Sequence, residues 1–201
     1  MSESSDCNTD QPSPEIKTAE NPVAQPTINT QRLVLRPFDE ADCDTVQELL
    51  QCKEIAANTR TIEHPYPDGA ARIWIGTHLP KWNRGEAAIF AITLPDNPQA
   101  AIGAIGLEIN APDENAELGY WIGQPFWGRG ICSEAAQAIV DFGFQHFGLK
   151  KIHAHHVASN PASGRVMEKI GMAKEGYLKS HIKKWGVFQD VVFYDIVATD
   201  D

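Results

Sequence analysis

The sequence predicts one α/β (α+β) domain in which a β-sheet is flanked by helices, and three observations support this prediction. Strand-like and helix-like patterns alternate along 201 residues in the order β, α, α, β, β, β, α, β, α, β, β. Two pairs of β-prone segments are joined by short turns, which predicts hairpins. Between them, a β-prone run at 117–122 leads through a glycine loop directly into a helix.

The composition is that of an ordinary soluble chain, with 42% hydrophobic and 22% charged residues, and the length suffices for one well-cored domain. No apolar run approaches the roughly 18 residues that a membrane span needs. The first residues also lack the basic and apolar segments of a signal peptide. We therefore expect a cytoplasmic protein without membrane contact. The formal net charge of -10 disfavours non-specific binding of nucleic acid.

The four cysteines have neither CxxC spacing nor the density of a disulfide scaffold. This pattern fits a reducing compartment. We expect Cys43 and Cys132 to be small packing residues.

The first 26 residues differ in composition from the rest of the chain. They contain five acidic residues, one basic residue, four prolines and no aromatic residue. Such a segment cannot bury enough apolar surface to offset its ordering entropy. We therefore expect a disordered acidic tail at 1–26 and a folded domain at 27–201.

The folded domain is predicted to begin with a strand and a helix. Residues 32–36 are β-prone and stop at Pro37. Asp39 follows as a candidate helix N-cap, because its side chain can accept from the first unpaired N–H groups. The apolar side of this helix carries Cys43, Val46 and Leu50.

A second helical stretch is predicted from about Asp68, with an interruption at Pro80 and an end at Gly85. The irregular segment 62–67 separates the two helical stretches. We expect Trp74 and Trp82 to be packing residues rather than contacts to a substrate.

Apolar β-prone runs at 88–94 and 100–109 are separated by the turn residues 95–98, so they are predicted to form a hairpin. A second turn at 112–115 returns the chain into the strand at 117–122.

The loop after this strand contains Gly128 and Gly130 and opens a helix. The apolar positions of that helix recur at helical spacing: Ala136, Ile139, Val140, Gly143 and Phe147. A helix N-terminus presents unpaired N–H groups, and glycines allow a phosphate close approach to the backbone. The segment therefore has the build of an anion cradle.

Three phosphate-binding loops compete for this segment. A Walker A loop needs a Lys-Ser or Lys-Thr after its last glycine, and the chain has none there. A dinucleotide-binding loop needs a carboxylate at the end of the next strand, where residues 157–160 supply none. The third possibility is a loop for the pyrophosphate of an acyl-CoA.

The next predicted strand, 151–157, contains three histidines that raise the question of a metal site. On a strand His153 and His155 share one face and His156 points to the other, so at most two converge on one ion. Neither a cysteine nor a carboxylate lies at ligand spacing. We expect no metal site.

The chain is predicted to end with one helix and one hairpin. Asn160 is a candidate N-cap with Pro161 at the first helical position, and Gly171 ends the helix. Two β-prone segments at 173–182 and 187–197 follow, joined by residues 183–186.

Four ordered segments resemble the GNAT superfamily of N-acetyltransferases, and within it the ribosomal-protein N-terminal (RimJ/RimL-like) group. The loop Trp-Gly-Arg-Gly-Ile-Cys at 127–132 resembles the acyl-CoA loop of that group, and segments 30–37, 117–121 and 160–172 resemble its other typical blocks. The resemblance implies a GNAT fold with a mixed, mostly antiparallel twisted sheet. It places the acyl-CoA loop between the fourth strand and the third helix.

The resemblance also implies site residues. Glu117 lies where GNAT enzymes often place a general base, and Ser163 lies where a serine of the group approaches the CoA sulfur. Some ribosomal-protein members carry a catalytic glutamate where this chain has Ile182, which leaves the acceptor open. The residues expected to bind acetyl-CoA are Tyr120, Trp121, Ile122, Trp127, Gly128, Arg129, Gly130, Ile131, Cys132, Ser133, Asn160 and Ser163.

The expected function is transfer of an acetyl group from acetyl-CoA to a primary amine by direct attack in a ternary complex, without a metal. This reaction needs a base for the amine, donors for the carbonyl oxygen and a proton for the thiolate. The acceptor can be the N-terminus of a protein, including a ribosomal one, or a small amine such as a polyamine, an amino acid or an antibiotic. A non-catalytic acyl-CoA sensor, or an interaction protein acting through the tail, is the alternative. We expect a monomer or homodimer.

Overall fold

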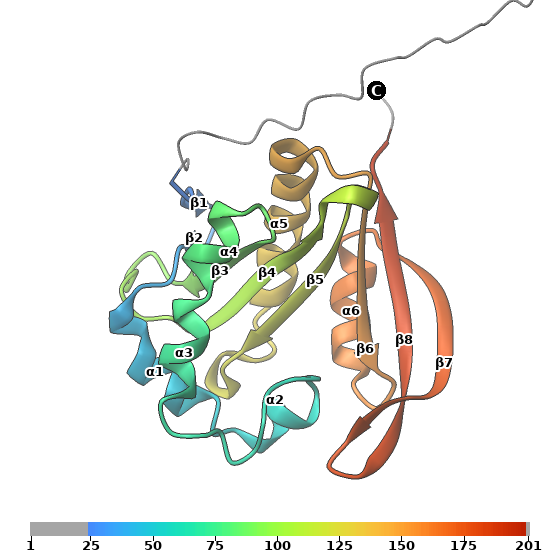
Figure 1. Cartoon of the computed structure of the whole chain (residues 1–201), viewed down its shortest axis with the longest axis horizontal. Coiled ribbons are helices and arrows are strands. Elements are labelled where there is room, and N and C mark those ends of the chain that lie inside the picture. Colours follow the sequence, from blue (N-terminus) through green and yellow to red (C-terminus); the bar gives the residue numbers. More distant parts are fainter. Residues whose placement is uncertain (1–23, 200–201) are drawn as a thin grey trace, which may run out of the picture.

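The computed structural model describes residues 24–199, which form one sheet of eight strands with helices on both faces (Figure 1). The predicted tail at 1–26 lies, for its first 23 residues, outside the described part of the chain. Within the remainder, the side chain of Gln25 donates a hydrogen bond to the carbonyl oxygen of Ile89 at 2.8 Å.

The sheet has the strand order β1-β2-β3-β4-β5-β6-β8-β7. Every neighbouring pair is antiparallel except β5 and β6, so the predicted mixed, mostly antiparallel sheet is confirmed. The strands are β1 (Ile28–Asn29), β2 (Val34–Arg36), β3 (Ala87–Thr93), β4 (Gly103–Asn110), β5 (Asn115–Ile122), β6 (Lys151–Val157), β7 (Ala173–Lys184) and β8 (Val187–Val197).

Six α-helices are found among the described residues. They are α1 (Cys43–Leu49), α2 (Lys53–Ala57), α3 (Ala70–Gly76), α4 (His78–Asn83), α5 (Ile131–Phe147) and α6 (Pro161–Lys169). Helices α5 and α6 pack together on one face of the sheet, and α1 packs against α3 on the other. None of the described helices is long and apolar enough to cross a membrane.

Two apolar clusters cover the two faces, as the alternation of side chains along a strand requires. In β3, Phe90 and Ile92 belong to the cluster under α5, whereas Ala91 belongs to the cluster under α1 and α3. In β5, Leu118 and Trp121 divide in the same way. Both clusters are nearly closed to solvent, so the helices hold the sheet from both sides.

The first predicted helix starts where its cap signal lies. Asp39 accepts from the N–H of Ala41, and Asp42 reaches back to the N–H of Asp39, which forms a capping box ahead of a 3₁₀ turn, Glu40–Asp42, and α1. The Asp42 carboxylate is buried and is paired with Arg36 at 2.8 Å. This pair fastens the helix to the end of β2.

The second predicted helix is interrupted at Thr77, not at Pro80, so that expectation is wrong. Pro80 lies in the first turn of α4. The N–H groups of a first turn have no partner within the helix, so a proline there removes no hydrogen bond.

Two short elements and one turn also differ from the expectations. Strand β1 and helix α2, which have two and five residues, were not predicted from the sequence. The final hairpin turn is Trp185-Gly186 rather than 183–186, because both residues have positive φ angles, 48° and 81°. Positive φ at both central positions suits a two-residue hairpin, so β7 extends two residues further than predicted, whereas β8 has the predicted bounds.

The opening that matters for function lies between β5 and β6. These parallel strands are paired only from Asn115 to Glu117 on β5 and from Lys151 to His153 on β6. Beyond these residues the strands separate, and Figure 1 shows the widening gap between them. The second half of β5 and the start of α6 border this opening.

Candidate active site

The glycine loop leads directly into α5, as the sequence predicts. Gly128 and Gly130 both have φ of 75°, a left-handed conformation that residues with a Cβ rarely adopt. Gly130 is the N-cap of α5, which starts at Ile131. A Cβ on Gly128 would meet nothing within 4 Å, so the loop backbone is open to an approaching group.

A set of contacts from the N-terminal segment fixes this loop. Glu134, in the first turn of α5, accepts hydrogen bonds from the Thr30 hydroxyl at 2.7 Å and from the Arg32 backbone N–H at 2.8 Å. The Arg32 guanidinium pairs with the same carboxylate at 2.7 Å and donates to the carbonyl oxygen of Arg129 at 3.1 Å. The loop is therefore held in place before any ligand binds.

A cavity of about 380 Å³ lies against the loop. All the residues predicted to bind acetyl-CoA line it: Tyr120, Trp121, Ile122, Trp127, Gly128, Arg129, Gly130, Ile131, Cys132, Ser133, Asn160 and Ser163. Other residues that line this cavity were not predicted from the sequence, among them Asn58, Thr59, Arg165 and Lys169. Arg165 and Lys169 lie one turn apart on α6, and this spacing places two cations on the same side of the helix, which could have been predicted.

Asn160 precedes α6 as predicted, but its side chain makes no capping hydrogen bond, so its expected role as a side-chain cap is wrong. Its φ and ψ angles are -111° and 71°. Pro161 at the first helical position has no N–H, so one of the four N–H groups that a helix start leaves unpaired is already absent. Asn160 lines the smaller cavity.

A second, larger cavity of about 890 Å³ adjoins the first. It is lined from both faces of the sheet, by Tyr66 and Trp74 near α3 and by Met167 on α6, so it runs through the opening between β5 and β6. The two cavities share the lining residues Asn58, Thr59, Tyr120, Trp121 and Ser163. A ligand in one cavity can therefore meet a ligand in the other at these residues.

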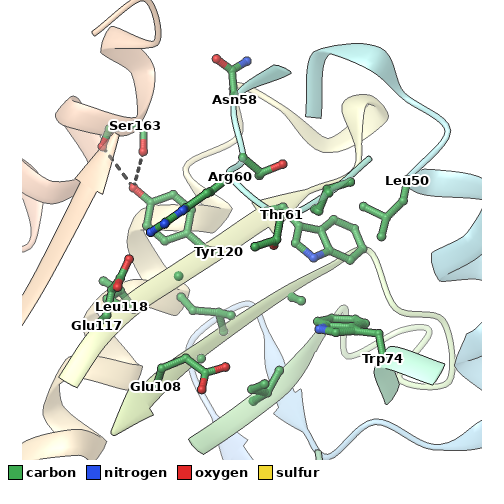
Figure 2. A pocket seen from close by; sticks show the side chains of 18 of the residues that line it. Leu50, Asn58, Arg60, Thr61, Trp74, Glu108, Glu117, Leu118, Tyr120 and Ser163 are labelled. Carbon is green, nitrogen blue, oxygen red and sulfur yellow. Dashed lines mark hydrogen bonds between the residues drawn. The ribbon is translucent and has the colours of Figure 1, made fainter. Parts of the chain in front are cut away.

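A hydroxyl pair occupies this junction. The Tyr120 hydroxyl lies 2.8 Å from Ser163 Oγ and donates to the Ser163 carbonyl oxygen at 3.1 Å (Figure 2). Burial raises the pKa of the Tyr120 hydroxyl far above its ordinary value, although the hydrogen bond to Ser163 acts in the opposite sense. Tyr120 therefore stays protonated at neutral pH, and the pair can supply a proton or a hydrogen bond.

The predicted base, Glu117, lies on the wall of the larger cavity and is paired with His155. Glu117 Oε1 is 3.0 Å from Nδ1 of His155, and the two side chains are 45% and 18% exposed. The hydrogen bond from His155 lowers the pKa of Glu117, against the effect of burial. The pairing of His155 with Glu117 was not predicted from the sequence, because the two residues lie on different strands.

The three histidines of β6 divide between the faces as predicted. His153 is the register partner of Glu117 and lies on the face of His155. His156 is buried on the other face, where a Cβ on Gly164 would lie 2.8 Å from its Nε2. Among residues 24–199 no group of three or more potential ligands can hold a metal ion.

Both cysteines that were expected to pack do so. Cys43 is buried in the first turn of α1, and Cys132 packs against the larger apolar cluster. Burial raises the pKa of the Cys132 thiol to about 12. Although Cys132 lines the smaller cavity, it is therefore a thiol rather than a reactive thiolate at neutral pH.

The two tryptophans that were expected to pack have different surroundings. Trp82 is buried and stacks on Phe142, which confirms a packing role. Trp74 packs on His78 with ring centroids 4.4 Å apart, and it also lines the larger cavity. Ile182 lines the same cavity from β7.

The tip of the last hairpin contacts segment 58–62, whose residues line the two cavities. Lys184, at the end of β7, is 8% exposed. Its Nζ donates to the carbonyl oxygens of Thr59 at 3.0 Å, Arg60 at 3.3 Å and Ile62 at 2.5 Å. Residues 58–62 are thereby fastened to β7, far away in the sequence.

Comparisons with known proteins agree with this site. Residues 32–173 match the protein family described as acetyltransferase (GNAT) domain. The chain is 30% identical over 174 residues to the uncharacterized N-acetyltransferase YnaD of Bacillus subtilis, covering 86% of this chain and 98% of YnaD. It is 27% identical to the ribosomal protein uS5-alanine N-acetyltransferase of Escherichia coli, covering 86% and 91%. The fold matches a ribosomal-protein N-acetyltransferase, RimL, solved with coenzyme A, with a TM-score of 0.78, 20% identity and coverage of 86% and 98%.

Proposed function

The chain belongs to the GNAT acetyltransferase family and is an acetyl-CoA-dependent N-acetyltransferase, and we propose that it acetylates the N-terminal amine of a protein by direct attack in a ternary complex. One observation carries the proposal. The loop cavity and the larger cavity meet at Tyr120, Trp121 and Ser163. Two substrates can therefore be bound at once with their reacting groups at this junction.

In this proposal acetyl-CoA binds in the smaller cavity with its pyrophosphate on the glycine loop. The fit is supported by the open left-handed backbone at Gly128 and Gly130 and by the N-terminus of α5 behind it. The side chains of Arg129, Arg165 and Lys169 line the same cavity. Three cations beside the loop suit the phosphate groups of a CoA ester in a chain whose net charge is -10.

The amine acceptor binds in the larger cavity, whose volume of about 890 Å³ has room for the first residues of a peptide. Its nitrogen bonds to the thioester carbonyl carbon, and the carbon–sulfur bond breaks. The proton that the nitrogen gives up goes to the Glu117–His155 pair, which lies on the cavity wall. The leaving sulfur takes the hydroxyl proton of Ser163, whose hydrogen bond to Tyr120 connects it to a second donor.

A cationic small amine is the second candidate acceptor, and the acidic lining of the larger cavity favours it. Glu63, Glu108 and Glu117 all line this cavity. Glu108 and Glu117 face each other across β4 and β5, where like charges destabilise a sheet unless cations compensate them. Lys81 compensates Glu108 at 2.9 Å, so the acidic character toward an acceptor comes mainly from the other two.

A turnover assay decides between the two acceptors. We propose incubating the protein with acetyl-CoA and either peptides that begin with alanine or serine, or polyamines such as spermidine, and following thiol release together with product mass. Peptide acetylation at the α-amine supports the first candidate, and polyamine acetylation supports the second. Binding of CoA without turnover of any amine would indicate a sensor.

The Escherichia coli relative is named for acetylating a ribosomal protein, uS5. This similarity supports our expectation that the present protein is also cytoplasmic.

A further inference from the structure

The imidazole of His155 is fixed by contacts on two sides. Glu117 Oε1 lies 3.0 Å from Nδ1 of His155. On the adjacent strand Phe193 is the register partner of His155, and the two rings stack with centroids 5.2 Å apart and 25° between their planes. Phe193 is in turn contacted edge-on by His181 of β7, at 5.6 Å. The ring therefore has one defined orientation before a substrate arrives.

The pairing with Glu117 also fixes which ring nitrogen carries the proton. An ionised carboxylate can only accept hydrogen bonds, so Nδ1 of His155 must donate. In a neutral imidazole the other nitrogen, Nε2, then has a free lone pair. Within residues 24–199, the polar contact of the His155 ring is made by Nδ1, and Nε2 forms no hydrogen bond with the protein. His155 lines the larger cavity, so this lone pair is available at the acceptor site.

Proton-transfer chemistry favours the imidazole over the carboxylate. A general base works best when its pKa is near the operating pH, and histidine side chains ordinarily titrate at about 6.5 and glutamate at about 4.3. The hydrogen bond from His155 lowers the pKa of Glu117 further. The carboxylate is thus a weak proton acceptor in this arrangement but an effective partner for the imidazolium that would form.

Other charged groups surround this pair. His153 of β6 is a register partner of Glu117, and burial lowers its pKa. Arg60 reaches toward Glu117 from segment 58–62 and, like His153, stabilises its ionised form. Further titratable groups on the packed elements include Glu63, Glu108, Lys151, Glu175, His181 and Asp195. Lys151 and Asp195 neutralise each other at 2.8 Å, so Glu117 is the dominant partner of His155.

We propose that Nε2 of His155 accepts the proton of the attacking amine and that Glu117 is a positioning residue that orients His155 through Nδ1. The inference rests on the proposed function. As the new carbon–nitrogen bond forms, one proton passes from the amine nitrogen to Nε2. The resulting imidazolium is stabilised by Glu117 and later releases this proton to water. The proton that Ser163 gives to the leaving thiolate is replaced from water, so the protons balance.

The first experiment measures the tautomer of His155 in the full-length protein, without turnover. Two-bond ¹H–¹⁵N correlation spectra of ¹⁵N-histidine-labelled protein are recorded as the pH is raised from 5 to 9, and the His155 signals are assigned by their loss in His155→Gln. We expect the neutral form to carry its proton on Nδ1. A neutral form with the proton on Nε2 would overturn the proposal whether or not the protein acetylates any amine.

The second experiment compares kcat as a function of pH with the peptide or polyamine that the wild-type protein acetylates. His155→Gln is expected to lower kcat by about 10²-fold or more and to remove the decline of kcat at acidic pH. Glu117→Gln is expected to keep that decline but to move its midpoint to lower pH, because the imidazole loses its anionic partner. His153→Gln, on the same face of β6, is the matched control and should leave the midpoint close to that of the wild type.

Two kinetic outcomes would contradict the assignment. If kcat no longer declines at acidic pH in Glu117→Gln but still declines in His155→Gln, Glu117 itself is the base. If kcat declines at acidic pH in both variants, the proton of the amine goes to water. If the proposed function itself is wrong, the result is different, because the wild-type protein then releases no thiol with any amine. The tautomer measurement would still show whether Nδ1 of His155 carries the proton.

Discussion

The hydroxyl of Tyr120 and Oγ of Ser163 are 2.8 Å apart, and they join β5 to the first turn of α6 at the place where the two cavities meet (Figure 2). The pair lies on the opposite side of β5 from Glu117, because successive residues of a strand point to opposite faces. The strand therefore separates a proton-donating side from a proton-accepting side, and the acetyl group has to be transferred in the opening between β5 and β6.

This arrangement predicts that the two hydroxyls act as a unit. Ser163→Ala should lower kcat by about tenfold or more, and Tyr120→Phe should also lower it, because each removes one partner of the same hydrogen bond. The double variant should lose much less than the product of the two single losses. Acetylation rates of the four proteins at saturating substrates test this. Losses that simply multiply would mean that the hydroxyls act independently.

The glycine loop predicts a specific binding defect. Gly130→Ala should raise the dissociation constant of acetyl-CoA by about tenfold or more, since a methyl group at the loop keeps the phosphates from the backbone N–H groups. Gly85→Ala is the matched control, because Gly85 also has a positive φ, 67°, but lies outside both cavities. Both variants bear a similar strain of about 1–2 kcal/mol. Calorimetric titration with acetyl-CoA should show weaker binding only for Gly130→Ala.

Lys184 predicts a link between the last hairpin and the acceptor site. Lys184→Met should release residues 58–62, raise KM for the amine and cost about 1–3 kcal/mol of stability, because three partly buried carbonyl oxygens lose their donor. Lys183→Met removes the same charge from an exposed neighbour and serves as the control. Thermal unfolding and acceptor kinetics of both variants provide the measurement. Equal effects of the two substitutions would remove the proposed link.

His78 predicts a stability that depends on pH. It is buried between Phe38 and Trp74, and neither ring nitrogen has a hydrogen-bond partner within the described chain. Burial lowers the pKa of His78 to about 4, with a smaller contribution from the nearby charge of Lys81. The unfolded chain takes up this proton at about pH 6.5 and the folded protein only near pH 4, so acid favours unfolding between these values.

The expected loss is about 3 kcal/mol between pH 7 and pH 4, from about 1.4 kcal/mol per unit of pKa difference. His78→Leu should lack this part of the decline, because it has no proton to take up. Urea unfolding of both proteins at several pH values measures the difference. Parallel stability curves for wild type and variant would show that His78 is protonated in the folded state as readily as in the unfolded one.

Features that depend on neighbours in the sequence could be predicted from the sequence. The cap at Asp39 and the start of a helix directly after the glycine loop depend on residues close together in the sequence, and both are confirmed. The break at Pro80 was placed wrongly because proline fits the first turn of a helix as well as its end. Whether a helix restarts there depends on packing against β3, which no local pattern records.

Features that depend on strand register could not be predicted in the same way. The partnership of Glu117 with His155 follows from the single parallel pairing in the sheet and from where that pairing stops. The contacts of Lys184 follow from a two-residue turn that lets β7 reach segment 58–62. Sequence spacing gives no measure of either distance, because both join parts of the chain that only the sheet brings together.

The central claim is that an amine in the larger cavity attacks acetyl-CoA in the smaller cavity directly. An alternative route would acetylate the enzyme first, and the Cys132 thiol lines the smaller cavity, but burial raises the pKa of this thiol to about 12. The direct test is the initial rate of thiol release with both substrates varied. Direct attack predicts intersecting reciprocal plots and no acetylated protein when the amine is left out. Parallel plots, together with a protein mass raised by one acetyl group, would contradict it.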